Sequence, residues 1–69
     1  MSEGITIHIN GEDRIVKATS LSELVAEMGL EQRMIAIECN LEVVPRSQYE
    51  STALKNGDRI ELVHMIGGG

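Results

Sequence analysis

The chain has 69 residues, 11 of them acidic and 6 basic, and its formal charge is −5 with a pI near 4.8. A chain of this length holds one domain and has little room for a large enclosed active site. Nucleic acids and anionic membranes select basic surfaces, so the charge argues against both as partners. A protein partner with a basic docking face is the natural complement.

The chain has a single cysteine, Cys39, which excludes an internal disulfide and suits a reducing compartment. No apolar run approaches the roughly 20 residues that cross a bilayer. The first four residues lack the basic and apolar regions of a signal peptide. We therefore expect a cytoplasmic protein.

The N-terminal third predicts a β-hairpin followed by a helix. Residues 5–9 alternate apolar and polar, and Asn10-Gly11 is the strongest two-residue signal for a type I′ turn. The returning strand covers residues 12–17, where Ile15 and Val16 compete for the buried side and we favour Val16.

A short helix is expected over residues 21–28. Ser20 and Glu23 have the spacing of a capping box, and Gly29 supplies the left-handed residue that ends a helix. One face of this helix is an apolar stripe: Leu21, Leu24, Val25 and Met28. Two turns are too short to persist alone, so the helix must pack on a sheet.

The second half of the chain predicts three more strands. Residues 34–40 alternate, with Ile35, Ile37 and Cys39 on one side. After a tight connection near residues 40–42, residues 43–44 form a short strand ended by Pro45. An irregular crossover over 46–55, with one helical turn near 47–49, leads to a last strand over 59–66. In that strand Ile60 and Leu62 face inward, and Val63 and Met65 lie on the opposite face. The pattern predicts an α+β fold with one helix on one face of a sheet of four to five strands.

The sequence ends in Gly67, Gly68 and Gly69. Glycines lose the most backbone entropy on ordering and bury no side chain, so they cannot stabilise a fold. They are therefore slack, a remnant of the way the protein was made, or a slender extension that carries the Gly69 carboxylate into a narrow channel. From the three glycines alone, slack is the better interpretation.

Arg46 and Tyr49 could contact a partner or could have a local structural role after Pro45. Cys39 is interpreted as a small core residue rather than a sulfur relay. His8 and His64 could approach each other if the first and last strands pair, but two histidines without a third ligand are a weak metal signal. No metal site is predicted.

Over nearly its whole length the chain resembles the ThiS family of sulfur carriers in thiamine-thiazole biosynthesis. The resemblance rests on Asn10-Gly11-Glu12, Ile35-Ala36-Ile37 leading to Asn40, Val44-Pro45-Arg46-Ser47, Leu54, Gly57-Asp58-Arg59-Ile60-Glu61-Leu62-Val63 and the three terminal glycines. Leu41, Met65 and Cys39 depart from residues common in the family.

The resemblance implies a ubiquitin-like β-grasp domain over residues 1–66, with its first and last strands parallel at the centre, and a flexible reactive tail over 67–69. It also implies that a ThiF-type, E1-like adenylyltransferase uses ATP and magnesium to adenylate the Gly69 carboxylate. Cysteine-derived sulfur then replaces AMP, and a ThiG-type thiazole synthase accepts the sulfur. Gly67 and Gly68 would give slender access to the partner, and Val63, Met65 and Ile66 would form the docking surface.

Two further interpretations stay open. The small subunit of molybdopterin synthase uses the same tail chemistry, and a ubiquitin-like modifier or inert binding module would use none. An enzyme in its own right is not favoured, because no nucleophile with its base, paired carboxylates or phosphate loop is recognisable. The chain is therefore expected to be a protein cosubstrate with no bound cofactor.

Overall fold

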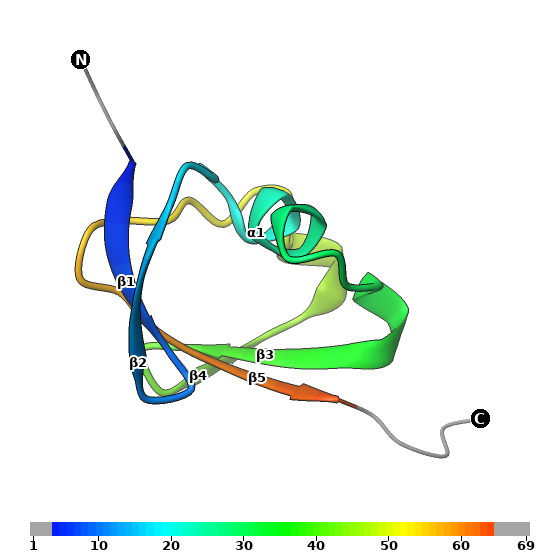
Figure 1. The fold of residues 1–69 in the computed structure, drawn as a ribbon. Coiled ribbons are helices and arrows are strands. Elements are labelled where there is room, and N and C mark those ends of the chain that lie inside the picture. Colours follow the sequence, from blue (N-terminus) through cyan, green and yellow to red (C-terminus); the bar gives the residue numbers. More distant parts are fainter. Residues whose placement is uncertain (1–3, 65–69) are drawn as a thin grey trace.

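The computed structural model describes residues 4–64, which form five strands, one α-helix and two short 3₁₀ turns (Figure 1). The elements in chain order are β1 (Ile5–Ile9), β2 (Glu12–Val16), α1 (Leu21–Glu27), η1 (Gln32–Met34), β3 (Ile35–Cys39), β4 (Glu42–Val44), η2 (Arg46–Gln48) and β5 (Arg59–His64).

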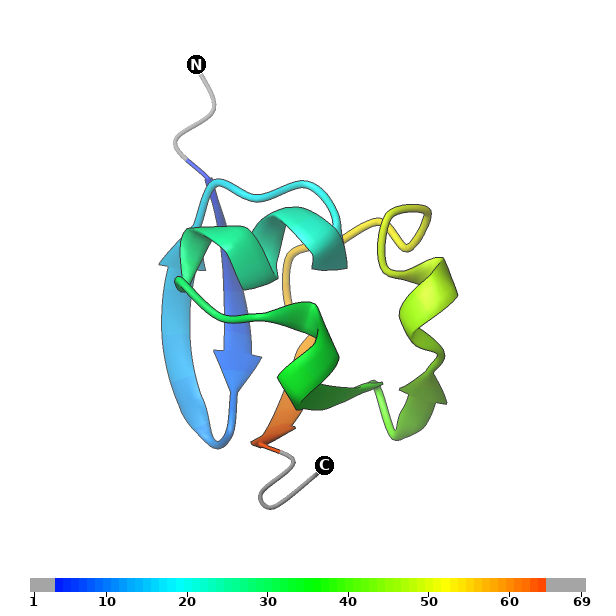
Figure 2. The ribbon, with the colours of Figure 1, turned by 90° about the vertical axis from the view of Figure 1, so that its right-hand side faces the viewer.

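The strands form one mixed sheet in the order β2-β1-β5-β3-β4. The first strand, β1, runs parallel to the last, β5, and the other neighbouring pairs are antiparallel. Helix α1 packs across one face of the sheet, and the β1–β2 hairpin and β4 lie on opposite sides of β5 (Figure 2). This is the ubiquitin-like β-grasp arrangement expected from the sequence, and it makes β5 the central strand.

The core lies between α1 and the inner face of the sheet. Each inner strand contributes alternate side chains that are almost fully buried, including Ile7, Ile37 and Ile60. On β2 the structure confirms the choice of Val16, which is buried, while Ile15 is 71% exposed. The sequence left Tyr49 open as a possible partner contact; it is only 2% exposed and belongs to the core, where burial raises its pKa.

The start of α1 is capped, although not as a reciprocal capping box. The Ser20 hydroxyl accepts a hydrogen bond from the Glu23 N–H at 3.2 Å, as predicted. The Glu23 carboxylate instead accepts from the backbone N–H of Thr19 at 2.8 Å and from its hydroxyl at 2.9 Å. These bonds, the backbone one foremost, hold the pKa of Glu23 below its usual range.

The crossover after β4 is tied to the helix rather than to the sheet edge. The N–H of Leu21 donates to the carbonyl of Thr52 at 3.1 Å, and the N–H of Ser22 donates to that of Tyr49 at 3.0 Å. These two helix-terminal donors have no partner inside the helix, so the crossover satisfies them. The irregular crossover was predicted, but its hydrogen bonds to α1 were not.

Element boundaries differ from the sequence expectation by one or two residues. Strand β3 begins at Ile35 rather than Met34, because η1 occupies Gln32–Met34. Strand β4 begins at Glu42, and the helical turn η2 spans Arg46–Gln48. Cys39 packs against the core as predicted but is half-buried rather than enclosed.

Candidate functional site

The candidate site is the end of β5, from which the chain continues toward the terminal glycines. Val63 pairs with Ala36 and His64 pairs with Ile35, both on β3. On its other side β5 pairs with β1 in parallel, from His8 opposite Arg59 to Ile9 opposite Ile60. The predicted site residues Met65, Ile66, Gly67, Gly68 and Gly69 lie outside the described residues, so their roles stay predictions.

Asn10 attaches the first hairpin turn to β5. Its φ of 50° and that of Gly11, 84°, are both positive, as the predicted type I′ turn requires. The Asn10 backbone N–H donates to the Ile60 carbonyl at 3.0 Å. Its side-chain Oδ1 accepts from the Leu62 N–H at 2.8 Å, and its Nδ2 donates to the Leu62 carbonyl at 3.2 Å. The side chain therefore continues the β1–β5 pairing after β1 has turned away.

Asn40 makes the corresponding attachment from the second hairpin. It too has a left-handed φ, 52°. Its backbone N–H donates to the Arg59 carbonyl at 2.7 Å, and its Oδ1 accepts from the Arg59 N–H at 3.0 Å. Its Nδ2 also donates to Asp58 Oδ1 at 3.0 Å. Two turn asparagines thus hold β5 from opposite sides, Asn40 at its start and Asn10 near its end.

The sequence indicated both turns but neither attachment. The residue type could have indicated these attachments, because asparagine tolerates a positive φ and its side-chain amide carries both a donor and an acceptor. A glycine or aspartate could make the same turn but could not make both bonds.

Val63 lies on the sheet face away from α1, as predicted. Its side chain is 59% exposed, whereas Ile60 and Leu62 on the same strand are buried on the inner face. Ala36, its neighbour on β3, is also exposed. The structure therefore places an accessible apolar contact at the end of β5; its role in docking stays a prediction.

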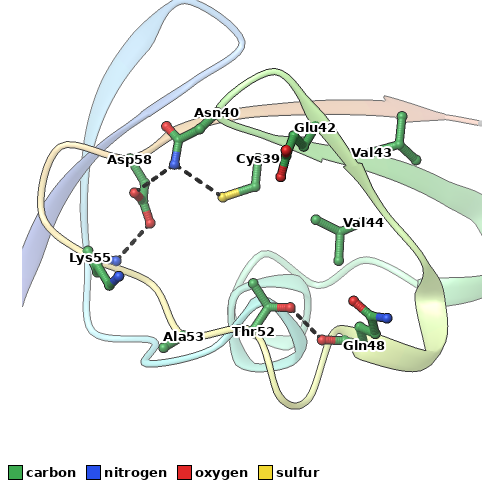
Figure 3. Close-up of a pocket in the computed structure, with 10 residues that line it drawn as sticks. All are labelled: Cys39, Asn40, Glu42, Val43, Val44, Gln48, Thr52, Ala53, Lys55 and Asp58. Atoms are coloured by element: carbon green, nitrogen blue, oxygen red, sulfur yellow. Dashed lines mark hydrogen bonds between the residues drawn. The ribbon is translucent and has the colours of Figure 1, made fainter.

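A polar hollow lies between the β3–β4 hairpin and the crossover, and Cys39 faces it (Figure 3). The Nδ2 of Asn40 lies 3.6 Å from the Cys39 sulfur. Burial, and then the negative charges of Asp58 and Glu42, raise the pKa of the Cys39 thiol. Because the thiolate is the nucleophilic form, this environment does not favour a sulfur relay through Cys39.

The two histidines are not brought together. His8 pairs in register with Arg59, at the start of β5, and its Nδ1 contacts Asp13 Oδ1. His64 lies five residues further along β5, which is about 17 Å in an extended strand. The suggestion that pairing of the first and last strands could bring them close is wrong. Within residues 4–64 no three His, Cys, Asp or Glu side chains are grouped to hold a metal ion.

Helix α1 has 7 residues. Within residues 4–64 no helix is long and apolar enough to cross a membrane.

Comparison with known proteins gives one consistent family. The sequence profile of the ThiS family matches residues 7–69. The sulfur carrier protein ThiS of Bacillus subtilis is 32% identical over 65 residues, which cover 91% of this chain and 98% of that protein. The crystal structure of a thiamine biosynthesis protein, ThiS, from Geobacter metallireducens superposes with a TM-score of 0.80 at 28% identity, covering 94% of this chain and all of that one.

A longer relative matches more strongly in sequence. The thiazole synthase of Paramagnetospirillum magneticum is 47% identical over 62 residues, or 88% of this chain. The chain spans about a fifth of the length of that relative, 19%. The match of the family profile through residue 69, together with the β-grasp topology, shows that the chain belongs to the ThiS family.

Proposed function

We propose that this chain is the sulfur carrier of a thiamine-thiazole pathway and that sulfur is carried on the carboxyl group of Gly69. The observation that carries the proposal is the family match, which extends through the three glycines to residue 69. The attachment of β5 by Asn10 and Asn40 supports it, because these bonds hold the strand that leads to the glycines against both neighbouring hairpins.

The chemistry needs an activating partner. A carboxylate is a poor acyl donor because its oxygen is a poor leaving group. We infer that an E1-like adenylyltransferase binds ATP and magnesium, that a Gly69 carboxylate oxygen attacks the α-phosphorus, and that pyrophosphate leaves. Cysteine-derived sulfur at the oxidation level of sulfide then attacks the acyl carbon and AMP leaves, which yields a thiocarboxylate. Gly67 and Gly68 would admit the tail to a narrow channel, and Met65 and Ile66 would extend the docking surface of Val63.

The acceptor of the sulfur is inferred to be a thiazole synthase. Longer relatives that carry a segment similar to this chain are named thiazole synthase, which favours a partnership between the two kinds of protein. In this scheme the chain is consumed and regenerated as a cosubstrate and is not itself a catalyst. A reducing cytoplasm would suit its single cysteine.

Intact mass spectrometry tests the proposal. The chain is incubated with a cognate E1-like enzyme, ATP, magnesium and a sulfur source, and the expected change is replacement of one oxygen by sulfur. Oxidation of any of the four methionines nearly matches this mass change, so the product is also trapped with an alkylating reagent in a Cys39→Ala background. In that background the thiocarboxylate is the expected site of alkylation.

The matched control is deletion of Gly69, which lies outside the described fold and should leave thermal unfolding unchanged. The deletion should abolish the mass shift. A shift that persists in the deletion variant would contradict the proposal. Transfer of the sulfur to thiazole synthase, rather than to a precursor of molybdopterin, then separates this function from that of a molybdopterin synthase subunit.

A further inference from the structure

Two glutamates face each other across the outer face of the sheet. Glu38 on β3 and Glu61 on β5 are directly paired in the antiparallel register. Side chains so paired lie about 5 Å apart at Cβ, and like charges in this position destabilise a sheet. The two ion pairs found among residues 4–64 are His8–Asp13 and Glu31–Arg33, and neither neutralises the glutamates.

Exposed apolar side chains lie beside the glutamates on β4 and in the next row toward the end of β5. Val43 on β4 pairs with Glu38 in the same row, and Val63 and Ala36 form the next row toward the end of β5. All three apolar residues are exposed, and α1 covers the other face of the sheet. We call these five residues the outer patch: Ala36, Glu38, Val43, Glu61 and Val63.

Arg59, the cation nearest to the glutamates along β5, does not neutralise them either. Arg59 lies two residues before Glu61 on the same face, opposite Asn40 in the β3–β5 ladder. Its guanidinium is not within ion-pair distance of either glutamate in the described structure. Within residues 4–64 neither carboxylate is therefore in an ion pair, and both are open to a cation from outside.

We propose that the outer patch docks onto a thiazole synthase surface that presents one arginine or lysine between apolar side chains, with the cation placed between Glu38 and Glu61. The choice of partner rests on the function proposed above. Charge complementarity carries the proposal, since a cation would pair with both carboxylates while the apolar contacts exclude water around them. The chain's net charge of −5 would speed the encounter with a basic face.

The position of the patch limits the geometry of the complex. Residues 62–69 follow Glu61 and, fully extended, span at most about 28 Å. The basic side chain on the thiazole synthase must therefore lie within about that distance of the pocket that receives Gly69. A basic residue further away could not contact the outer patch while the tail is engaged.

The test is equilibrium binding of the full chain to its cognate thiazole synthase. The variant Glu38→Gln/Glu61→Gln removes both charges and keeps the side-chain size. The control Glu27→Gln/Glu50→Gln changes the net charge equally at exposed positions outside the patch. We expect at least about 10-fold weaker binding for the patch variant and less than about 2-fold for the control. The patch variant should also show a smaller loss of affinity between low and high salt.

Thermal unfolding separates docking from a structural role. Because Glu38 and Glu61 form no ion pair in the described structure, removing their charges should leave the Tm equal to or above that of the parent chain. Equal binding by all three chains, or equal weakening by both double variants, would overturn the proposal, as would a lowered Tm that accounts for the weaker binding. If only binding to the activating enzyme is weakened, the assignment to thiazole synthase is wrong.

Failure of this inference can be told apart from failure of the proposed function. Thiocarboxylate formation on the unmodified chain is measured separately by mass. If the thiocarboxylate forms and reaches thiazole synthase while the patch variant binds normally, the outer patch inference alone falls. If no thiocarboxylate forms with an active partner, the proposed function falls as well.

Discussion

The amide of Asn10 pairs with both backbone groups of Leu62, 52 positions later in the chain: Oδ1 accepts from the Leu62 N–H at 2.8 Å and Nδ2 donates to its carbonyl at 3.2 Å. The side chain thereby takes the place of a strand residue, because β1 has already turned into its hairpin. It links the first turn of the chain to the strand that leads to the terminal glycines.

Replacing Asn10 with glycine should weaken this attachment selectively. Glycine keeps the positive φ but removes both side-chain hydrogen bonds, so we expect a loss of about 1–2 kcal/mol in the free energy of unfolding. Amide hydrogen exchange at Leu62 should accelerate more than exchange at Ile37, whose N–H belongs to the β3 ladder and serves as the internal control. Unchanged relative exchange at Leu62 would show that the bond does not protect it.

Leu41 is held in a left-handed conformation that suits glycine better. Its φ is 72° in the β3–β4 turn, and its side chain is 74% exposed, so little packing compensates for the strain. We expect Leu41→Gly to raise the free energy of unfolding by about 0.5–1 kcal/mol in chemical denaturation. Leu41→Ala is the control, since alanine retains the strain and should give little gain. Equal stabilisation by both would point to the exposed side chain rather than the backbone.

The lowered pKa of Glu23 predicts a defined pH dependence. A carboxyl whose folded pKa lies below its unfolded pKa adds stability above the unfolded value, about 4.3, and that stability is lost as the pH falls through the folded pKa. Glu23→Gln should therefore be less stable than the parent at pH 7, and the difference should vanish under strongly acidic conditions. Urea unfolding across this range measures it.

The control for Glu23 is Glu27→Gln, on the exposed side of the same helix. Its free energy of unfolding should differ little from that of the parent at pH 7. If the Glu23 difference instead grows on acidification, the Thr19 hydrogen bonds do not favour the ionised carboxylate.

Val63 should affect binding without affecting the fold. Val63→Thr keeps the β-branched shape and changes one methyl to a hydroxyl at an exposed position, so the free energy of unfolding should change by less than about 0.5 kcal/mol. Burying that hydroxyl unpaired at an interface should weaken partner binding about 5–30-fold. Calorimetric titration measures the affinity of the variant and the parent.

Ile15→Thr provides the comparison, because Ile15 is exposed on β2, an edge strand separated from β5 by β1. It should leave binding unchanged. Equal weakening by both substitutions would show that general surface hydrophobicity, and not the end of β5, determines docking.

Short-range sequence patterns were sufficient to predict most of the strands and the helix. The Asn10-Gly11 turn, the period-two strands and the Ser20 cap each depend on contacts within a few residues, so short-range chemistry specifies them. The choice of Val16 over Ile15 was also correct, although two adjacent apolar residues left the buried side of that strand ambiguous. The resemblance to the ThiS family supplied the pairing of the first and last strands, which no local pattern contains.

Long-range register explains what the sequence alone could not predict. His8 and His64 lie far apart, and Glu38 and Glu61 lie side by side, because residues distant in the chain were aligned by strand pairing. Tyr49 is buried because the crossover returns over the helix start, and Asn10 and Asn40 reach β5 only once the sheet has assembled. Side-chain type and spacing determined which elements form; cooperative packing of the whole sheet decided which residues meet on its faces.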